Sequence, residues 1–158
     1  MSDTAKTMNF QIHLTDDCNL NCLHCYHDGA FNNYLDSGQF DYILKEVLDY
    51  TRSHGRVPGR AIFCGGEPTL SPILFESIAK CREAGYNSIS VLTNGTLITD
   101  EYAQKLRQAG CTSVQICIEG NRETHNNIRN GTFTWSWQPG KPAGETGWRS
   151  KTRPPSSP

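Results

Sequence analysis

The stretch from Thr15 to Tyr26, TDDCNLNCLHCY, decides how this chain is interpreted. It contains three of the seven cysteines, Cys18, Cys22 and Cys25, in a C-x3-C-x2-C spacing. Thiolates are the usual protein ligands of iron-sulfur clusters. The neighbouring Asp and Asn residues favour the tight turns that wrap a loop around such a group. Three thiolates would hold three corners of a cubane cluster and leave its fourth iron open to a small ligand.

A structural zinc site is the main alternative, with His24 or His27 as the fourth ligand. Zinc sites usually pair their ligands as two knuckles separated in sequence, and one triplet of cysteines fits that pattern poorly. A group of redox thiols is a further alternative. The spacing disfavours it, because the set does not stand at a helix start after a thioredoxin-like strand.

Composition and charge argue against several other classes of function. The chain has 158 residues and a formal net charge of −1, without a block of like charges, so we expect no nucleic acid and no membrane as partner. The polar N-terminus lacks the apolar core of a secretory signal, and no apolar run approaches the roughly 20 residues of a membrane span. With an odd number of cysteines, these features predict a cytoplasmic protein without a disulfide framework. Four cysteines lie outside the triplet, mostly in apolar segments, and are expected to be buried thiols: Cys64, Cys81, Cys111 and Cys117.

Short apolar segments alternate with helical periodicity along the rest of the chain. Strands are expected at residues 9–14, 61–64, 88–92 and 113–118, the second of them after a Pro-Gly turn. Helices are expected to begin at the capping residues Ser37, Ser71 and Thr99 and to end before Gly55, Gly85 and Gly110. Strands and helices that alternate with short connections predict an α/β fold, with a parallel sheet and crossover helices.

Motifs that suit ligand binding follow three of the expected strands. They are Gly65-Gly66-Glu67-Pro68, Thr93-Asn94-Gly95 and Cys117-Ile118-Glu119-Gly120. Glycine lets backbone approach a ligand closely, and ligands of barrel-type β/α folds sit at the carboxyl ends of the strands. Each motif would also fit an ordinary strand-to-helix turn. Its position after the cysteine loop is what favours ligand binding over a turn without function.

C-x3-C-x2-C directly after the first strand of a β/α repeat resembles the signature of the radical S-adenosylmethionine (SAM) superfamily. The wording of the Cys18–Tyr26 segment is most similar to the branch with SPASM or related extensions, which includes sulfatase-maturating and peptide-modifying enzymes. The resemblance covers roughly residues 10–133. It implies a partial (β/α) barrel of about four units.

The resemblance implies two cofactors and a set of residues around them. Cys18, Cys22 and Cys25 would ligate a 4Fe-4S cluster, and the Gly-Gly-Glu segment Gly65, Gly66 and Glu67 would hold the amino group of SAM. Thr93 and Asn94 would line the cofactor cavity. Cys117 stands where relatives commonly have Ser, and Arg129 ends a segment like the family's His-Asp-x-x-Arg, as a partner for a carboxylate of SAM or substrate.

The family's chemistry would make the chain part of an enzyme that forms a 5′-deoxyadenosyl radical. Such a cluster needs a low-potential electron donor, of the flavodoxin or ferredoxin type or chemical. The branch-like wording predicts a peptide or protein side chain as substrate of the full-length parent. The competing interpretation is an inactive truncated iron-sulfur or zinc-binding fragment without catalysis. A full barrel takes roughly 250 residues, so we expect the chain as given to have little turnover.

The composition changes abruptly at residue 134. The segment 134–158 holds all three tryptophans and five of the eight prolines, and it has almost no aliphatic residues. Such a segment buries too little surface to offset its ordering entropy, so we expect residues 9–133 to form the core domain and 134–158 a disordered tail. A truncation or a frame-shift would explain the change, and a tryptophan-containing docking tail is the alternative.

Overall fold

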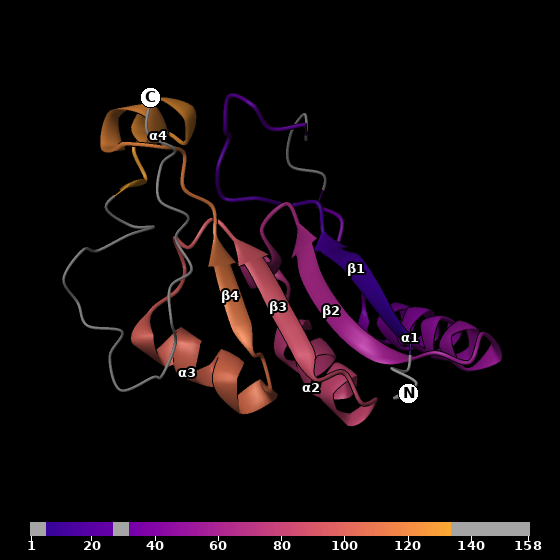
Figure 1. The fold of residues 1–158 in the computed structure, drawn as a ribbon. Helices are drawn as coiled ribbons and strands as arrows, with labels where there is room; N and C mark the ends of the chain where they lie inside the picture. The colour runs from indigo at the N-terminus through magenta and orange to yellow at the C-terminus, as the bar shows by residue number, and fades with distance from the viewer. Residues whose placement is uncertain (1–5, 27–31, 134–158) are drawn as a thin grey trace.

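Four parallel strands lie side by side in chain order and form the sheet of this protein (Figure 1). The structure is a computed structural model that describes residues 6–26 and 32–133. The strands are β1 (Thr7–Thr15), β2 (Val57–Gly65), β3 (Ser88–Thr93) and β4 (Ser113–Ile116). The helices are α1 (Ser37–Ser53), the 3-10 turn η1 (Pro68–Leu70), α2 (Leu74–Glu83), α3 (Asp100–Ala109) and α4 (Arg122–Ile128). The predicted α/β class, with a parallel sheet and crossover helices, is confirmed.

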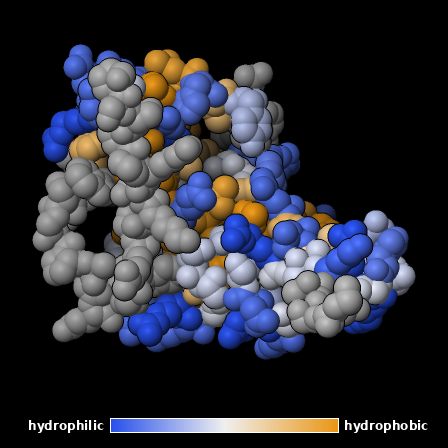
Figure 2. Space-filling model, in the orientation of Figure 1, coloured by the Kyte–Doolittle hydropathy of each residue, from blue (hydrophilic) through white to orange (hydrophobic). Residues whose placement is uncertain are grey.

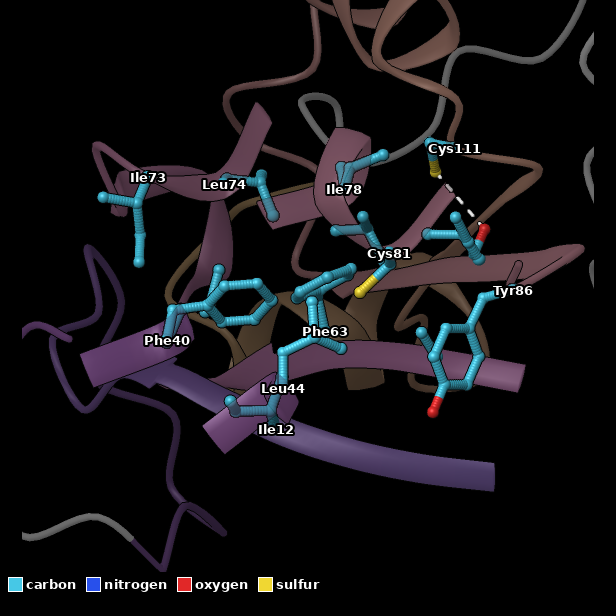
Figure 3. Close-up of a cluster of buried hydrophobic side chains, with 14 of the residues drawn as sticks. Ile12, Phe40, Leu44, Phe63, Ile73, Leu74, Ile78, Cys81, Tyr86 and Cys111 are labelled. Carbon is cyan, nitrogen blue, oxygen red and sulfur yellow. Dashed lines mark hydrogen bonds between the residues drawn. The ribbon is translucent and has the colours of Figure 1, made fainter. Parts of the chain in front are cut away.

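The hydrophobic core lies between the sheet and the crossover helices (Figure 3). Alternate residues of the central strands, such as Ala61 and Phe63 of β2, turn inward and are buried. Phe63 meets Phe40 of α1 with 6.2 Å between ring centroids, and Leu74 and Ile78 of α2 fill the same layer. This burial fixes which face of the sheet the helices cover, because a shift of one residue would turn every apolar side chain outward.

Two helix starts differ from the sequence expectation. Helix α1 is capped by Asp36, whose carboxylate accepts from the backbone N–H of Gln39 in a complete capping box, while the hydroxyl of Ser37 donates to Glu76. Asp36 is the cap in place of Ser37, because Gln39, three residues after Asp36, accepts a hydrogen bond from the Asp36 backbone N–H. Thr99 caps α3 as predicted, because its hydroxyl oxygen accepts from the backbone N–H of Tyr102.

The expected start at Ser71 is wrong. Helix α2 begins at Leu74, without a side-chain cap, and the Ser71 hydroxyl has no hydrogen-bond partner within the described residues. The chain before it forms the η1 turn instead, which Glu67 caps through the N–H of Thr69. The buried carboxylate of Glu67 therefore sets the backbone conformation of the segment for which Ser71-Pro72 predicted a helix start.

Strands β2 and β4 also differ in length from the expectation. Strand β2 already begins at Val57, so Pro58 pairs with Met8 of β1 and Gly59 lies in the strand at a shift of the register, where a separate turn was expected. Strand β4 ends at Ile116, and helix α4, capped by Asn121, follows where no helix was predicted. The predicted tail, residues 134–158, lies outside the described residues. None of the helices in the described ranges is long and apolar enough to cross a membrane.

Candidate functional site

The three clustered cysteines lie on the loop that follows β1, at the edge of the sheet where all strands end (Figure 1). Figure 1 shows this loop and helix α4 beyond the strand arrowheads, on the side away from the starts of the strands. Figure 2 shows hydrophobic side chains of the described residues on the same view, over the strands and near this edge. The parallel sheet therefore brings together the motifs that the sequence keeps up to about a hundred residues apart, from Cys18 to Arg129.

The loop after β2 supports the start of the cysteine loop through backbone contacts. The N–H of Gly66 donates to the carbonyl of Thr15 at 2.9 Å, and the N–H of Glu67 donates to the carbonyl of Asp17 at 2.7 Å. A Cβ atom on Gly66 would lie 2.2 Å from the Asp17 carbonyl oxygen. Gly65 has a φ of +126° and is equally crowded by the carbonyl of Thr15. Because glycine has no Cβ, the loop after β2 and the start of the cysteine loop are in direct backbone contact. The atoms nearest to both glycines therefore belong to the backbone of the cysteine loop.

The side chain of Glu67 points into the protein and is fully buried. Its Oε1 accepts from the N–H and the hydroxyl of Thr69 at 3.1 and 2.5 Å, and from the hydroxyl of Thr93 at 2.7 Å. Its Oε2 accepts from the backbone N–H of Asn94 at 2.8 Å. The carboxylate therefore joins the loop after β2 to the end of β3, and the hydroxyl of Thr93 donates its proton to this contact.

Asn94 extends the same connection to the first cysteine. Its Nδ2 lies 3.9 Å from Cys18 Sγ and donates to Asn19 Oδ1 at 2.8 Å. The N–H of Leu20 also points at Cys18 Sγ, at 3.4 Å. Burial raises the pKa of Cys18, and the hydrogen bond from Leu20 partly opposes it. Cys18 is thus a half-buried thiol that two N–H donors face.

The second cysteine is held from the other side, by the end of α4. The N–H of Leu23 donates to the carbonyl of Ile128 at 3.0 Å, and Asn130 Nδ2 donates to the carbonyl of Asn21 at 2.9 Å. Between them, a terminal nitrogen of Arg129 lies 4.0 Å from Cys22 Sγ. Helix α4, which the sequence did not predict, therefore anchors the middle of the cysteine loop.

Arg129 has a carboxylate partner within the chain. Its Nε and a terminal nitrogen donate to Glu119 Oε1 at 3.1 and 2.6 Å, and His24 Nε2 lies 3.4 Å from the same oxygen. The hydrogen bond from Arg129 lowers the pKa of Glu119. Burial raises the pKa of Cys22, and the charge of Arg129 opposes that rise. A contact between Arg129 and a carboxylate of SAM or substrate stays a prediction.

The two remaining predicted thiols differ in exposure. Cys25 is exposed, and its N–H closes a turn onto the carbonyl of Cys22 at 3.0 Å. Cys117 follows β4, where its N–H donates to the carbonyl of Thr93 at 3.2 Å. Burial raises the pKa of Cys117, and the charge of Arg129 opposes the rise. Cys117 therefore borders the site, next to the Arg129 and Glu119 pair.

The cysteine geometry bears on the two alternatives to an iron-sulfur cluster. Among residues 6–26 and 32–133, no group of three or more His, Cys, Asp or Glu side chains is arranged to hold a single metal ion. His27, one of the two candidate zinc ligands, lies outside the described residues. A reactive redox thiol usually has a lowered pKa, whereas burial raises the pKa of both Cys18 and Cys22.

Several contact residues escaped the sequence argument. Asn19 and Asn130 reach across the loop with their amides, and Thr69 completes the shell around Glu67. Such residues carry no spacing signal of their own, since Asn and Thr are common in any loop. The cap Asn121, three residues before Thr124, and the acidic Glu123 in the first turn are local signs that a helix begins there.

Replacing Arg129 with methionine is expected to lower the free energy of unfolding of the metal-free chain by about 1–3 kcal/mol, the usual cost of leaving a buried hydrogen-bonding group without its partner. The variant removes both donors to Glu119 and leaves that carboxylate partly buried without its main partner. Urea unfolding followed by circular dichroism measures the change. Arg129→Lys keeps the charge without the planar fork and should lose less. Equal stability of wild type and Arg129→Met would contradict the anchoring role.

Comparison with known proteins agrees with this arrangement. A model of the radical SAM superfamily matches residues 12–152, which runs past the domain boundary expected at 133. An AdoMet-dependent heme synthase of Methanosarcina barkeri is 39% identical over 118 residues, which cover 73% of this chain and 32% of the relative. The chain thus spans about a third of the length of this curated relative.

Solved structures share the fold. Native anSMEcpe, with AdoMet and the Cp18Cys peptide bound, is similar with a TM-score of 0.62 at 25% identity, over 82% of this chain and 38% of that chain. SuiB of Streptococcus suis, bound to the precursor peptide SuiA, gives a TM-score of 0.63 at 16% identity, over 80% of this chain and 28% of that one. The predicted partial (β/α) barrel is therefore confirmed.

A 4Fe-4S cluster and S-adenosylmethionine are the cofactors of the family whose model matches here. In this chain the cysteine loop follows β1 and the Gly-Gly-Glu loop follows β2, as the sequence predicted. The match of the model to most of the chain decides the assignment. The chain belongs to the radical SAM superfamily.

Proposed function

We propose that this chain forms the cluster-binding and SAM-binding part of a radical SAM enzyme, with Cys18, Cys22 and Cys25 as the cluster ligands. One observation carries the proposal. The three thiols share one loop at the carboxyl edge of the sheet, and side-chain donors from two other segments, Asn94 and Arg129, face two of the sulfur atoms.

The chemistry of these donors fits a cluster held by thiolates. N–H groups aimed at a cysteine sulfur stabilise its negative charge and influence the potential of an iron-sulfur centre. Cys18 has such donors in Leu20 and Asn94, and Cys22 has the positive charge of Arg129 beside it. Because both thiols have a raised pKa, assembly of the cluster must release their protons.

The remaining predicted residues lie on loops that contact the cysteine loop or one another. When bound together, the cluster and SAM supply one-electron cleavage of SAM, which yields a 5′-deoxyadenosyl radical. The chain's own residues hold and orient: the loops carrying Gly65–Glu67, Thr93–Asn94 and Cys117 surround the loop carrying the thiols. Arg129 and Glu119 place a charged pair beside Cys22. An electron donor of low potential belongs to this proposal as partner.

A peptide or protein side chain is the proposed substrate of the enzyme. The support is the likeness to anSMEcpe, whose solved structure holds a peptide beside AdoMet. A porphyrin-type substrate is the second candidate, because the heme synthase of M. barkeri is 39% identical whereas anSMEcpe is 25% identical.

Anaerobic reconstitution with iron and sulfide tests the cofactor proposal. We expect a brown protein with about four irons per chain and, after reduction with dithionite, an electron paramagnetic resonance (EPR) signal that changes when SAM is added. A colourless protein that holds zinc and takes up no iron would refute the ligand assignment. A cluster whose EPR signal ignores SAM would favour a carrier without the enzyme's chemistry.

The same reduced, SAM-loaded sample separates the two substrate classes. A cysteine-containing peptide and an iron porphyrin are added in turn, and the EPR signals are compared, because this readout needs no turnover. A change with the peptide alone supports the maturase proposal. A change with the porphyrin alone replaces it with the second candidate.

A further inference from the structure

We propose that Glu67 is a positioning residue, which holds Asn94 against the cluster ligand Cys18, and that its carboxylate does not contact SAM. The proposal rests on the proposed function, because it treats Cys18 as a cluster ligand. It also assigns to Glu67 a role different from the one that the family resemblance implies for the Gly-Gly-Glu segment.

Donors of the chain itself enclose the carboxylate of Glu67. Oε1 accepts from the N–H and hydroxyl of Thr69 and from the hydroxyl of Thr93, and Oε2 accepts from the N–H of Asn94. A carboxylate offers about four lone-pair sites, so Oε1 is saturated and one site remains on Oε2. Because the side chain is fully buried, an ammonium group could reach this site only if the enclosing loops moved apart. Such a movement would break hydrogen bonds to Glu67, and a buried donor left unpaired costs about 1–3 kcal/mol.

The same four bonds determine where the end of β3 lies. Glu67 accepts from Thr93 and Asn94, two consecutive residues, and Thr93 Oγ1 in turn accepts from the N–H of Gly95 at 3.0 Å. The N–H of Glu67 itself is bonded to Asp17, which directly precedes Cys18. One buried residue thus fixes both the backbone before the first thiol and the turn that faces this thiol.

The orientation of the Asn94 amide follows from its other partners. Its Oδ1 accepts from the backbone N–H of Thr96 at 2.9 Å and from the Thr96 hydroxyl at 2.7 Å. Since a backbone N–H can only donate, the oxygen of the amide must face Thr96, and Nδ2 is left to face Cys18 and Asn19. Asn19 Nδ2 closes the ring by donating to the hydroxyl of Thr96 at 2.8 Å. Asn94 is therefore a directed donor whose position depends on Glu67.

The two roles for Glu67 predict different effects before SAM is present. A positioning residue alters the surroundings of Cys18, so Glu67→Gln should change the EPR spectrum of the reduced, SAM-free cluster. Asn94→Ala keeps the backbone N–H that Glu67 accepts but removes the amide donor, so it should change the spectrum in the same direction. The double variant should show little change beyond Asn94→Ala, because the two residues act through one contact.

Two further variants guard the experiment. Thr93→Val removes one donor to Glu67 without touching its charge, and should give a smaller change of the same kind even if Glu67→Gln folds poorly. Glu101→Gln is the matched control, since Glu101 is an exposed carboxylate paired with Lys105 on α3 and should leave the spectrum unchanged. A SAM-free spectrum like that of wild type in Glu67→Gln, with SAM affinity lowered about tenfold or more, would overturn the proposal and restore the direct contact.

If the wild-type chain takes up no cluster, the proposed function is refuted. The dependence of Asn94 on Glu67 can still be tested without the cluster. In the metal-free chain, the side-chain amide signals of Asn94 in a ¹⁵N nuclear magnetic resonance spectrum should move in Glu67→Gln and stay in place in Glu101→Gln. Unmoved signals in Glu67→Gln would overturn the coupling between the two residues, whatever the metal content.

Discussion

Replacing Cys22 with alanine is expected to abolish the visible absorbance of the anaerobically reconstituted protein and most of its bound iron and sulfide. Three thiolates are the complete protein ligand set proposed for the cluster, so loss of one leaves a second iron without a protein ligand. Cys22 occupies the middle of the loop and is the thiol that Arg129 and the end of α4 position. Absorbance spectra with iron and sulfide analysis measure the effect.

Cys64→Ala is the matched control for this variant. Cys64→Ala also removes one thiol. Cys64, however, is buried in β2, where its S–H donates to the carbonyl of Ile12 at 3.5 Å. We expect the control to take up the same iron and sulfide as the wild type. Unchanged iron and sulfide in Cys22→Ala would show that the cluster ligands have been assigned wrongly.

Replacing Gly66 with alanine is expected to prevent normal packing of the cysteine loop and to reduce cluster loading severely. The new Cβ would lie 2.2 Å from the carbonyl oxygen of Asp17 and 2.4 Å from that of Asp16. Both obstacles are backbone atoms, which cannot turn away as a side chain would. The loop must move, so we also expect a loss of stability of about 1–3 kcal/mol or more. Urea unfolding and the iron content after reconstitution measure the two effects.

Gly55→Ala separates this steric effect from ordinary glycine strain. Gly55 has a φ of +61°, and an added Cβ would meet nothing within 4 Å. Its replacement costs about 1–2 kcal/mol of left-handed backbone strain, just before the start of β2 and therefore at the end of the sheet opposite the cysteine loop. We expect Gly55→Ala to lose stability but to load a full cluster. Normal loading of Gly66→Ala would mean that the two loops do not need their close contact.

The helix boundaries show where local patterns suffice. Thr99 and Gly110 delimit α3 as the sequence predicted, because cap and terminator act on their own neighbours. Ser71 failed as a cap because a buried residue, Glu67, captures the backbone just before it through Thr69. The local pattern fails here because the contact that orders this segment comes from the Glu67 carboxylate, while the Ser71 hydroxyl stays buried without a partner among the described residues.

The amino-acid sequence by itself determined the fold class, the cysteine triplet and the order of the motifs, because spacing and apolar periodicity are properties of neighbouring residues. The parallel sheet then decided which distant residues meet. It brings Asn94 to Cys18 and Arg129 to Cys22, and it joins Glu67 to Thr93. These contacts depend on strands that end at one edge and on the placement of an unpredicted helix, α4. Hydrogen bonds across such distances leave no periodic trace along the chain, so the tertiary structure had to supply them.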